Sequence, residues 1–81
     1  MKKPIIYISL HCPYCRKVQN FATDNNIDVE YKNRDEAKIR DELVGITGKT
    51  QVPYLVDAAH DVSMHESLDI IDHLEKYHMG K

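Results

Sequence analysis

The chain has 81 residues, a formal net charge of −2 and only two cysteines. A chain of this length has room for a modest core, and we expect residues 1–81 to form a single domain. The balance of 11 basic and 13 acidic residues argues against a nucleic-acid binder that works by neutralising phosphates. No segment has the length of a membrane-spanning helix, and the apolar run near the start is too short for a signal peptide. We therefore expect a cytoplasmic protein that binds neither nucleic acid nor a membrane.

The first half of the chain predicts a strand, a helix, a strand and a second helix. An apolar run indicates a strand over 5–10, and apolar residues at helical spacing indicate a helix over 13–25. Alternating apolar residues indicate a strand over 27–31. Acidic residues open a second helix over about 35–44. The residues expected to point inward from this helix are Ile39, Leu43 and Ile46. Gly45 and Gly48 are expected to end it.

The second half predicts two strands and a final helix. The strands cover 52–56 and 62–64 and are joined by the polar turn 57–61. Ser67 has the residue type of an N-cap for the last helix. The residues expected to point inward from this helix are Ile70, Ile71, Leu74 and Tyr77. The order β-α-β-α-β-β-α, with a right-handed first crossover, predicts an α/β fold in which a four-stranded mixed sheet has helices on both faces.

The two cysteines enclose Pro-Tyr at the junction between the first strand and the first helix. Pro13 suits the first helical position, which makes Cys12 the N-cap. Its sulfur then lies where free N–H groups and the helix dipole favour a thiolate, and Cys15 lies one turn further on. This geometry favours dithiol–disulfide exchange. A zinc site would need a second ligand pair, which His60 and His65 do not form in a recognisable pattern, and a structural disulfide would be unusual in so tight a loop.

Three motifs in this order resemble the glutaredoxins, which have the thioredoxin fold. They are Cys-Pro-Tyr-Cys at 12–15, Gln-Val-Pro at 51–53 and Glu-Ser at 66–67. The Glu-Ser pair replaces the Gly-Gly and Asp-Asp run that small glutaredoxins tend to carry. It is similar to the glutathione-transferase-like N-terminal domain of the larger bacterial glutaredoxins of the glutaredoxin-2 type.

The resemblance implies a cis peptide bond before Pro53 and a binding site for glutathione. An ordinary trans proline at an edge strand is the alternative, as is a plain helix cap at Ser67 beside a solvated glutamate. The resemblance assigns glutathione to Tyr14, Gln51, Val52, Pro53, Glu66 and Ser67. The glycine carboxylate of glutathione needs a cation or an amide, for which Arg40, Lys49 and Gln51 are candidates that the sequence does not rank.

The resemblance further implies a monomeric enzyme that reduces glutathione mixed disulfides and protein disulfides. Cys12 would be the nucleophile and Cys15 the resolving thiol. Glutathione would serve as co-substrate, glutathionylated or disulfide-bonded proteins as partners, and no metal is expected. Two alternatives stay open: a redoxin served by thioredoxin reductase, and a binding protein that holds a glutathione-ligated [2Fe–2S] cluster between two subunits.

Overall fold

The computed structural model describes residues 3–78. Its seven elements follow the predicted order β-α-β-α-β-β-α. They are β1 (Ile5–Ile8), α1 (Pro13–Asp24), β2 (Glu30–Asn33), α2 (Ala37–Thr47), β3 (Tyr54–Asp57), β4 (Val62–Met64) and α3 (Ser67–His78). The predicted thioredoxin-like fold is confirmed.

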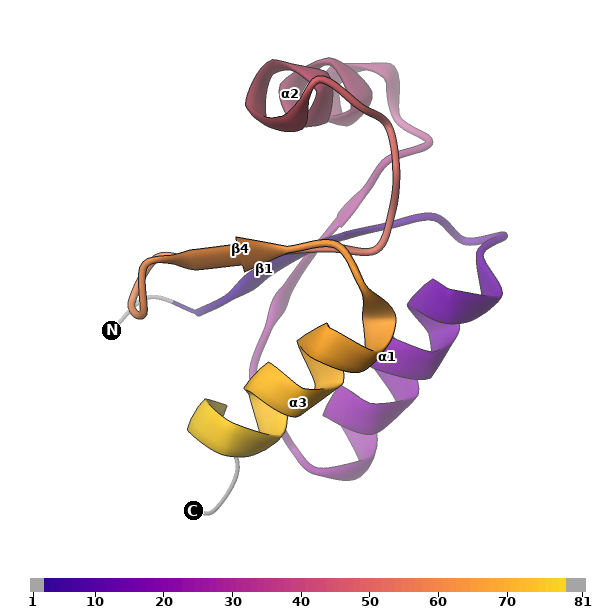
Figure 1. Cartoon of the computed structure of the whole chain (residues 1–81). Helices are drawn as coiled ribbons and strands as arrows, with labels where there is room; N and C mark the ends of the chain where they lie inside the picture. Colours follow the sequence, from indigo (N-terminus) through magenta and orange to yellow (C-terminus); the bar gives the residue numbers. More distant parts are fainter. Residues whose placement is uncertain (1–2, 79–81) are drawn as a thin grey trace.

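The four strands form one mixed sheet in the order β2-β1-β3-β4. The strand β1 is parallel to β2 and antiparallel to β3, and β4 is antiparallel to β3. The helices α1 and α3 lie side by side below the sheet and α2 lies above it (Figure 1). Tyr7 pairs with Tyr54 and Ile5 pairs with Val56, so the end of β3 lies beside the start of β1. The C-terminal end of β1 and the C-terminal end of β3 therefore lie at opposite ends of the sheet.

The core has a large part on the α1 and α3 face and a small part on the α2 face. The large part consists of Ile6, Ile8, Cys15, Val18, Ala22, Ile27, Leu55, Ile70 and Leu74. The small part consists of Tyr7, Leu43 and Tyr54. On this second face the Tyr7 hydroxyl donates to the Glu42 carboxylate, which also accepts a hydrogen bond from Lys32 Nζ at 2.8 Å. A polar contact thus supplements the thin apolar layer beneath α2.

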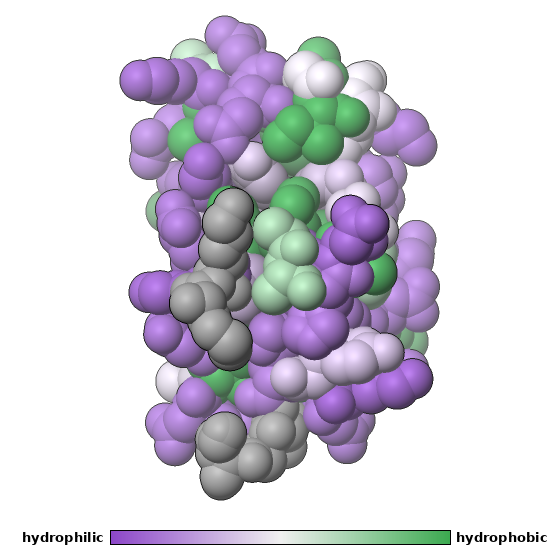
Figure 2. All heavy atoms as spheres, turned by 90° about the vertical axis from the view of Figure 1, so that its left-hand side faces the viewer, coloured by the Kyte–Doolittle hydropathy of each residue, from purple (hydrophilic) through white to green (hydrophobic). Residues whose placement is uncertain are grey.

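The two edge strands are short and partly exposed. β2 has four residues and β4 has three. The molecular end that carries the β3–β4 turn presents a mainly hydrophilic surface (Figure 2).

Within residues 3–78, no helix combines the length and the apolar character needed to cross a membrane.

The second strand and the second helix differ from the prediction because neighbouring contacts outweigh the local pattern. The second strand begins at Glu30, since the Ile27 N–H donates to the Ala22 carbonyl and its side chain joins the core before strand pairing starts. The second helix continues through Gly45 to Thr47. Gly48 then ends it in the left-handed conformation, with φ of 76°, a role that glycine fills without steric cost.

The expected inward positions at Ile46 and Tyr77 are wrong, because these side chains are 51% and 47% exposed. The assignment of Ser67 as a cap is also corrected. The Glu66 carbonyl accepts from the Ile70 N–H at 2.8 Å, so Glu66 has the N-cap position and Ser67 is the first helical residue. The first and third strands are likewise shorter than predicted, because pairing covers only Ile5–Ile8 and Tyr54–Asp57.

Candidate active site

Cys12 is the N-cap of α1, as predicted. Its backbone is extended, and its Sγ accepts a hydrogen bond from the Cys15 N–H at 3.4 Å. Pro13 follows at the first helical position. A sulfur at this place faces the free N–H groups of the first turn and the positive end of the helix dipole.

Cys15 lies one turn into the helix and is a buried member of the core. Burial raises the pKa of its thiol to about 12, and the neighbouring Cys12 contributes in the same direction. Both cysteines are free thiols in this structure. The two sulfurs are therefore chemically distinct, with a partly exposed thiol at the helix start and a protected thiol behind it.

The loop before Cys12 is held by a buried serine that the sequence analysis did not identify. Ser9 Oγ donates to the Asp35 carboxylate at 3.1 Å and accepts from the His11 N–H at 3.3 Å. The Ser9 carbonyl accepts from the Cys12 N–H at 3.3 Å. These bonds link the end of β1 to the segment before α2. They fix the backbone from which the nucleophile projects.

The Val52–Pro53 peptide bond is cis, as the resemblance implies. The Cys12 thiol lies 3.9 Å from the Val52 carbonyl oxygen, to which it donates a weak hydrogen bond. Forty residues of sequence separate these two groups, and the sheet brings them together. The proline loop therefore borders the reactive sulfur.

A pocket of about 310 Å³ opens beside this loop. Three chain segments line it: the first turns of α1, the loop before β3, and the start of α3. The lining residues are Tyr14, Lys17, Gln51, Val52, Pro53, His65, Glu66, Ser67 and Leu68. All six residues that the resemblance assigns to glutathione are among them. The structure thus brings residues from three separate motifs to one cavity.

The two weaker candidates, Arg40 and Lys49, do not line this pocket. The Arg40 guanidinium instead donates to the Asp35 carbonyl at 3.2 Å. Lys17 is the cation in the lining, and the sequence analysis did not assign it to glutathione. His65 is a second residue of the lining that the sequence analysis set aside.

His65 contributes a polar atom that no described residue satisfies. Its Nε2 is buried and has no hydrogen-bond partner within residues 3–78. Burial lowers the pKa of His65, and the nearby charge of Lys49 lowers it further. The ring packs on Tyr54 with 4.5 Å between centroids. A neutral, oriented imidazole at the pocket is therefore available to a ligand.

Comparison with known proteins gives the same fold and one family. Residues 6–81 match the model of the glutathione S-transferase N-terminal domain. A glutathione S-transferase from the Antarctic clam Laternula elliptica is 27% identical with a TM-score of 0.75, and covers 95% of this chain and 36% of that one. The apo form of human glutathione-S-transferase T1-1 is 28% identical with a TM-score of 0.75, and covers 90% of this chain and 31% of that one.

A third solved structure supports the fold alone. The glutaredoxin-like protein NrdH-redoxin from Escherichia coli is 20% identical with a TM-score of 0.75, and the match covers 99% of this chain and 100% of that one. The search of curated proteins gives no match. The chain spans about one third of the length of the two transferases named above. The family match extends over nearly all of the sequence, and the chain belongs to the glutathione S-transferase N-terminal domain family, with a thioredoxin-like fold.

Proposed function

We propose that this protein is a glutathione-dependent thiol–disulfide oxidoreductase that acts in a reducing compartment such as the cytoplasm. One observation carries the proposal. The Cys12 sulfur, at the N-terminus of α1, lies 3.9 Å from the Val52 carbonyl, and Val52 also lines the pocket beside it. A nucleophile is thus placed next to a cavity of about 310 Å³ that suits a small peptide.

The charges of the pocket complement those of glutathione. Glutathione carries a γ-glutamyl head with an ammonium and a carboxylate, and a second carboxylate on its glycine. Glu66 faces the ammonium, while Ser67 and the free N–H groups of the first turn of α3 receive the head carboxylate. Lys17 is the cation of the lining for the glycine carboxylate. The Val52 backbone pairs with the cysteinyl backbone of the peptide as a short added strand.

The chemistry starts with attack by the Cys12 thiolate on the glutathione sulfur of a mixed disulfide. The old S–S bond breaks, the partner leaves as a thiolate that takes up a proton, and Cys12 becomes disulfide-bonded to glutathione. A second glutathione thiolate attacks the glutathione sulfur of this intermediate. Oxidised glutathione leaves and the Cys12 thiolate is restored, so the net reaction converts the mixed disulfide and one glutathione thiol into a free substrate thiol and oxidised glutathione.

Cys15 enters only when the substrate is a protein disulfide. Its sulfur then attacks Cys12 in the enzyme–substrate disulfide, which releases the reduced protein and leaves a Cys12–Cys15 disulfide for glutathione to reduce. Because the pKa of Cys15 is about 12, this thiol is rarely ionised at neutral pH. The two-cysteine route is expected to be slower than the route through Cys12 alone. Leu10, Tyr14 and Leu68 are more than 60% exposed, and they supply apolar surface for a protein substrate.

The test is a coupled assay with glutathione, glutathione reductase, NADPH and a small glutathione mixed disulfide. NADPH consumption that depends on this protein supports the proposal. Replacing glutathione and its reductase with thioredoxin reductase tests the redoxin alternative. Turnover only with thioredoxin reductase, or with neither reductase, would reject glutathione as the electron donor. Iron content and colour of the purified protein test the cluster-binding alternative.

Glutathione transfer to an electrophile is a second candidate, which the family match favours. In that reaction the sulfur of bound glutathione must stay free to attack the electrophile. The Cys12 sulfur lies 3.9 Å from the carbonyl of Val52, which lines this pocket, and would instead hold the glutathione sulfur in a disulfide. An assay with an aromatic halide electrophile separates the candidates. If conjugation persists in Cys12→Ser while mixed-disulfide reduction was never present, the transferase function replaces the one proposed.

A further inference from the structure

Three histidines converge on one buried aspartate at the end of the sheet opposite the thiols. Asp57, the last residue of β3, is fully buried. Its Oδ2 lies 2.9 Å from His60 Nδ1, 2.7 Å from His73 Nε2 and 2.8 Å from His78 Nε2. All four ligand-type atoms lie within 4.8 Å of one another. From this convergence we propose that Asp57, His60, His73 and His78 form a binding site for a divalent transition metal ion, with Zn²⁺ the best match.

The hydrogen-bond pattern is unbalanced for a purely structural contact. Three imidazoles share a single carboxylate oxygen, whereas Asp57 Oδ1 is buried with no hydrogen-bond partner among the described residues. Buried polar atoms are almost always paired, so an oversubscribed oxygen beside an unused one calls for an explanation. A cation among Oδ2 and the three ring nitrogens would account for their convergence, because all four atoms are of types that bind such an ion.

The set of donor atoms matches zinc chemistry. Zn²⁺ takes four ligands in a tetrahedron from imidazole nitrogen and carboxylate oxygen at about 2.0–2.2 Å, which separates neighbouring ligand atoms by about 3.3 Å. The oxygen–nitrogen distances found here are 2.7 to 2.9 Å. Entry of the ion therefore requires the donors to separate by about 0.5 Å. Each ring must also turn its lone pair toward the ion and keep its proton on the other nitrogen.

The charge of the four side chains suits a divalent ion. One carboxylate and three neutral imidazoles leave a net charge of +1 when Zn²⁺ is bound. A buried site tolerates this charge better than the full +2 of the ion.

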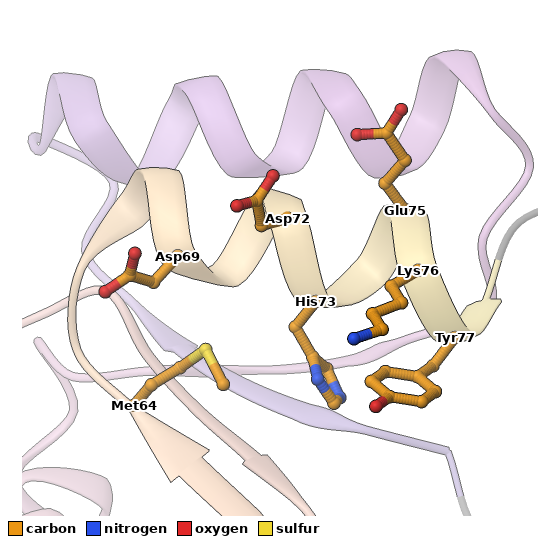
Figure 3. Close-up of a pocket in the computed structure, with 7 residues that line it drawn as sticks. All are labelled: Met64, Asp69, Asp72, His73, Glu75, Lys76 and Tyr77. Carbon is orange, nitrogen blue, oxygen red and sulfur yellow. The ribbon is translucent and has the colours of Figure 1, made fainter.

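Neighbouring residues fix two of the rings and leave the ion a route of entry. The Tyr77 ring packs on His60 and on His73, with centroids 4.5 and 4.9 Å apart. His73 and Tyr77 extend from the same side of α3, while Asp72 and Glu75 extend from another side (Figure 3). These four residues line a cavity of about 610 Å³ between β4 and α3. The His78 side chain is only 17% exposed and that of His60 is 34% exposed, so the site lies just beneath the surface.

The test uses the double variant Cys12→Ser, Cys15→Ser, because the two thiols bind zinc themselves. Zn²⁺ is titrated against a chromophoric chelator, and one equivalent is expected to bind. His60→Gln and His78→Gln in this background should each weaken binding at least about 100-fold, since loss of even an outer partner of a metal ligand costs 10- to 100-fold. His11→Gln is the matched control, because His11 is exposed and lies at the thiol end. It should leave the affinity unchanged.

Folding is followed in parallel by thermal melting with a chelator present and then with Zn²⁺. The double Cys→Ser variant should melt higher with Zn²⁺, as binding to the folded state alone requires, and the His60→Gln variant should not. Co²⁺ in place of Zn²⁺ should give the intense visible absorption of a tetrahedral site without a thiolate charge-transfer band. The proposal is overturned if the double variant binds no stoichiometric Zn²⁺. It is also overturned if His60→Gln and His78→Gln, shown to be folded, bind Zn²⁺ as tightly as His11→Gln does.

Discussion

The two ends of the sheet arrange polar groups in opposite ways. At the thiol end, Val52 and the first turn of α3 line an open pocket, and the Cys12 sulfur lies next to Val52. At the other end, three imidazoles point inward at a single buried carboxylate, that of Asp57. The first arrangement leaves reactive and binding groups accessible to a ligand. In the second arrangement the polar groups hydrogen-bond to one another.

This difference indicates where function and stability should separate. Groups that face a pocket contribute little to the folded state, because water satisfies them when the ligand is absent. Groups that satisfy each other inside the protein are costly to break, since each lost partner leaves a buried polar atom. Substitutions at the thiol end should therefore reduce activity without unfolding the chain. Substitutions at the histidine end should lower the free energy of unfolding and leave the activity of the folded protein unchanged.

The largest expected effect is on turnover at the thiol end. Cys12→Ser should reduce glutathione mixed-disulfide turnover to the rate without enzyme, because serine cannot form the covalent intermediate. Cys15→Ser should keep that activity and lose reduction of protein disulfides. NADPH consumption with each substrate measures both, and the melting temperature should change little in Cys12→Ser. A Cys15→Ser variant that is inactive on the small mixed disulfide would refute the route through one cysteine.

A second prediction concerns the protection of Cys15. Its raised pKa of about 12 keeps the thiol protonated below that pH, so at pH 8 only about one molecule in 10,000 carries the thiolate. Iodoacetamide at pH 8 should modify Cys12 alone, as read by mass spectrometry, and denaturant should expose both thiols. The Cys12→Ser variant, in which Cys15 is the only thiol, is the control. Its folded form should react much more slowly at pH 8 than its denatured form, and rapid modification of the folded form would show that Cys15 is not shielded.

The histidine end should show its effect in stability. Asp57→Asn keeps the shape of the side chain but removes the charge that accepts three hydrogen bonds, and should cost about 2–4 kcal/mol of unfolding free energy. Urea unfolding in the presence of a chelator measures it. Asp72→Asn on the exposed side of α3 is the matched control and should change little. Equal stability of the two variants would mean that the carboxylate at Asp57 does not hold this end together.

The smallest effect is expected for Glu66→Gln in the pocket. This exposed glutamate faces the ammonium of glutathione in the proposed complex, and an exposed ion pair contributes about 0.2–1 kcal/mol. The apparent affinity for glutathione should fall about 1.4- to 5-fold, with an unchanged melting temperature. Glu75→Gln, near the other end of the same helix, should change neither quantity. If Glu66→Gln binds glutathione as wild type does, Glu66 is only a solvated residue before α3.

The fold and the thiol end were predictable from sequence because their signals are local. Cys12 and Pro13 carry the helix start within two residues, and the structure places Cys12 at the N-cap as expected. Six of the nine pocket residues belong to three short motifs, each next to the beginning of a helix or strand. Each motif could be interpreted on its own. The sheet then brings the three together.

The histidine end could not be predicted because its members are far apart in sequence and follow no helical spacing. His73 and His78 are five residues apart, which turns an α-helix by about 140° beyond a full turn, so they are not on one face. His78 reaches Asp57 from the last residue of α3. His60 comes from the turn after β3, three residues beyond Asp57. Only the packing of α3 along the sheet places these rings around one oxygen.

The character of the two edge strands has a consequence for self-association. An uncovered edge offers unpaired backbone groups to another chain, and charged or very short edge strands discourage such pairing. β2 carries Glu30 and Lys32 at one edge, and β4 is only three residues long at the other. Growth of the sheet from chain to chain is thus opposed at both edges. We expect concentrated solutions of the reduced protein to resist β-aggregation.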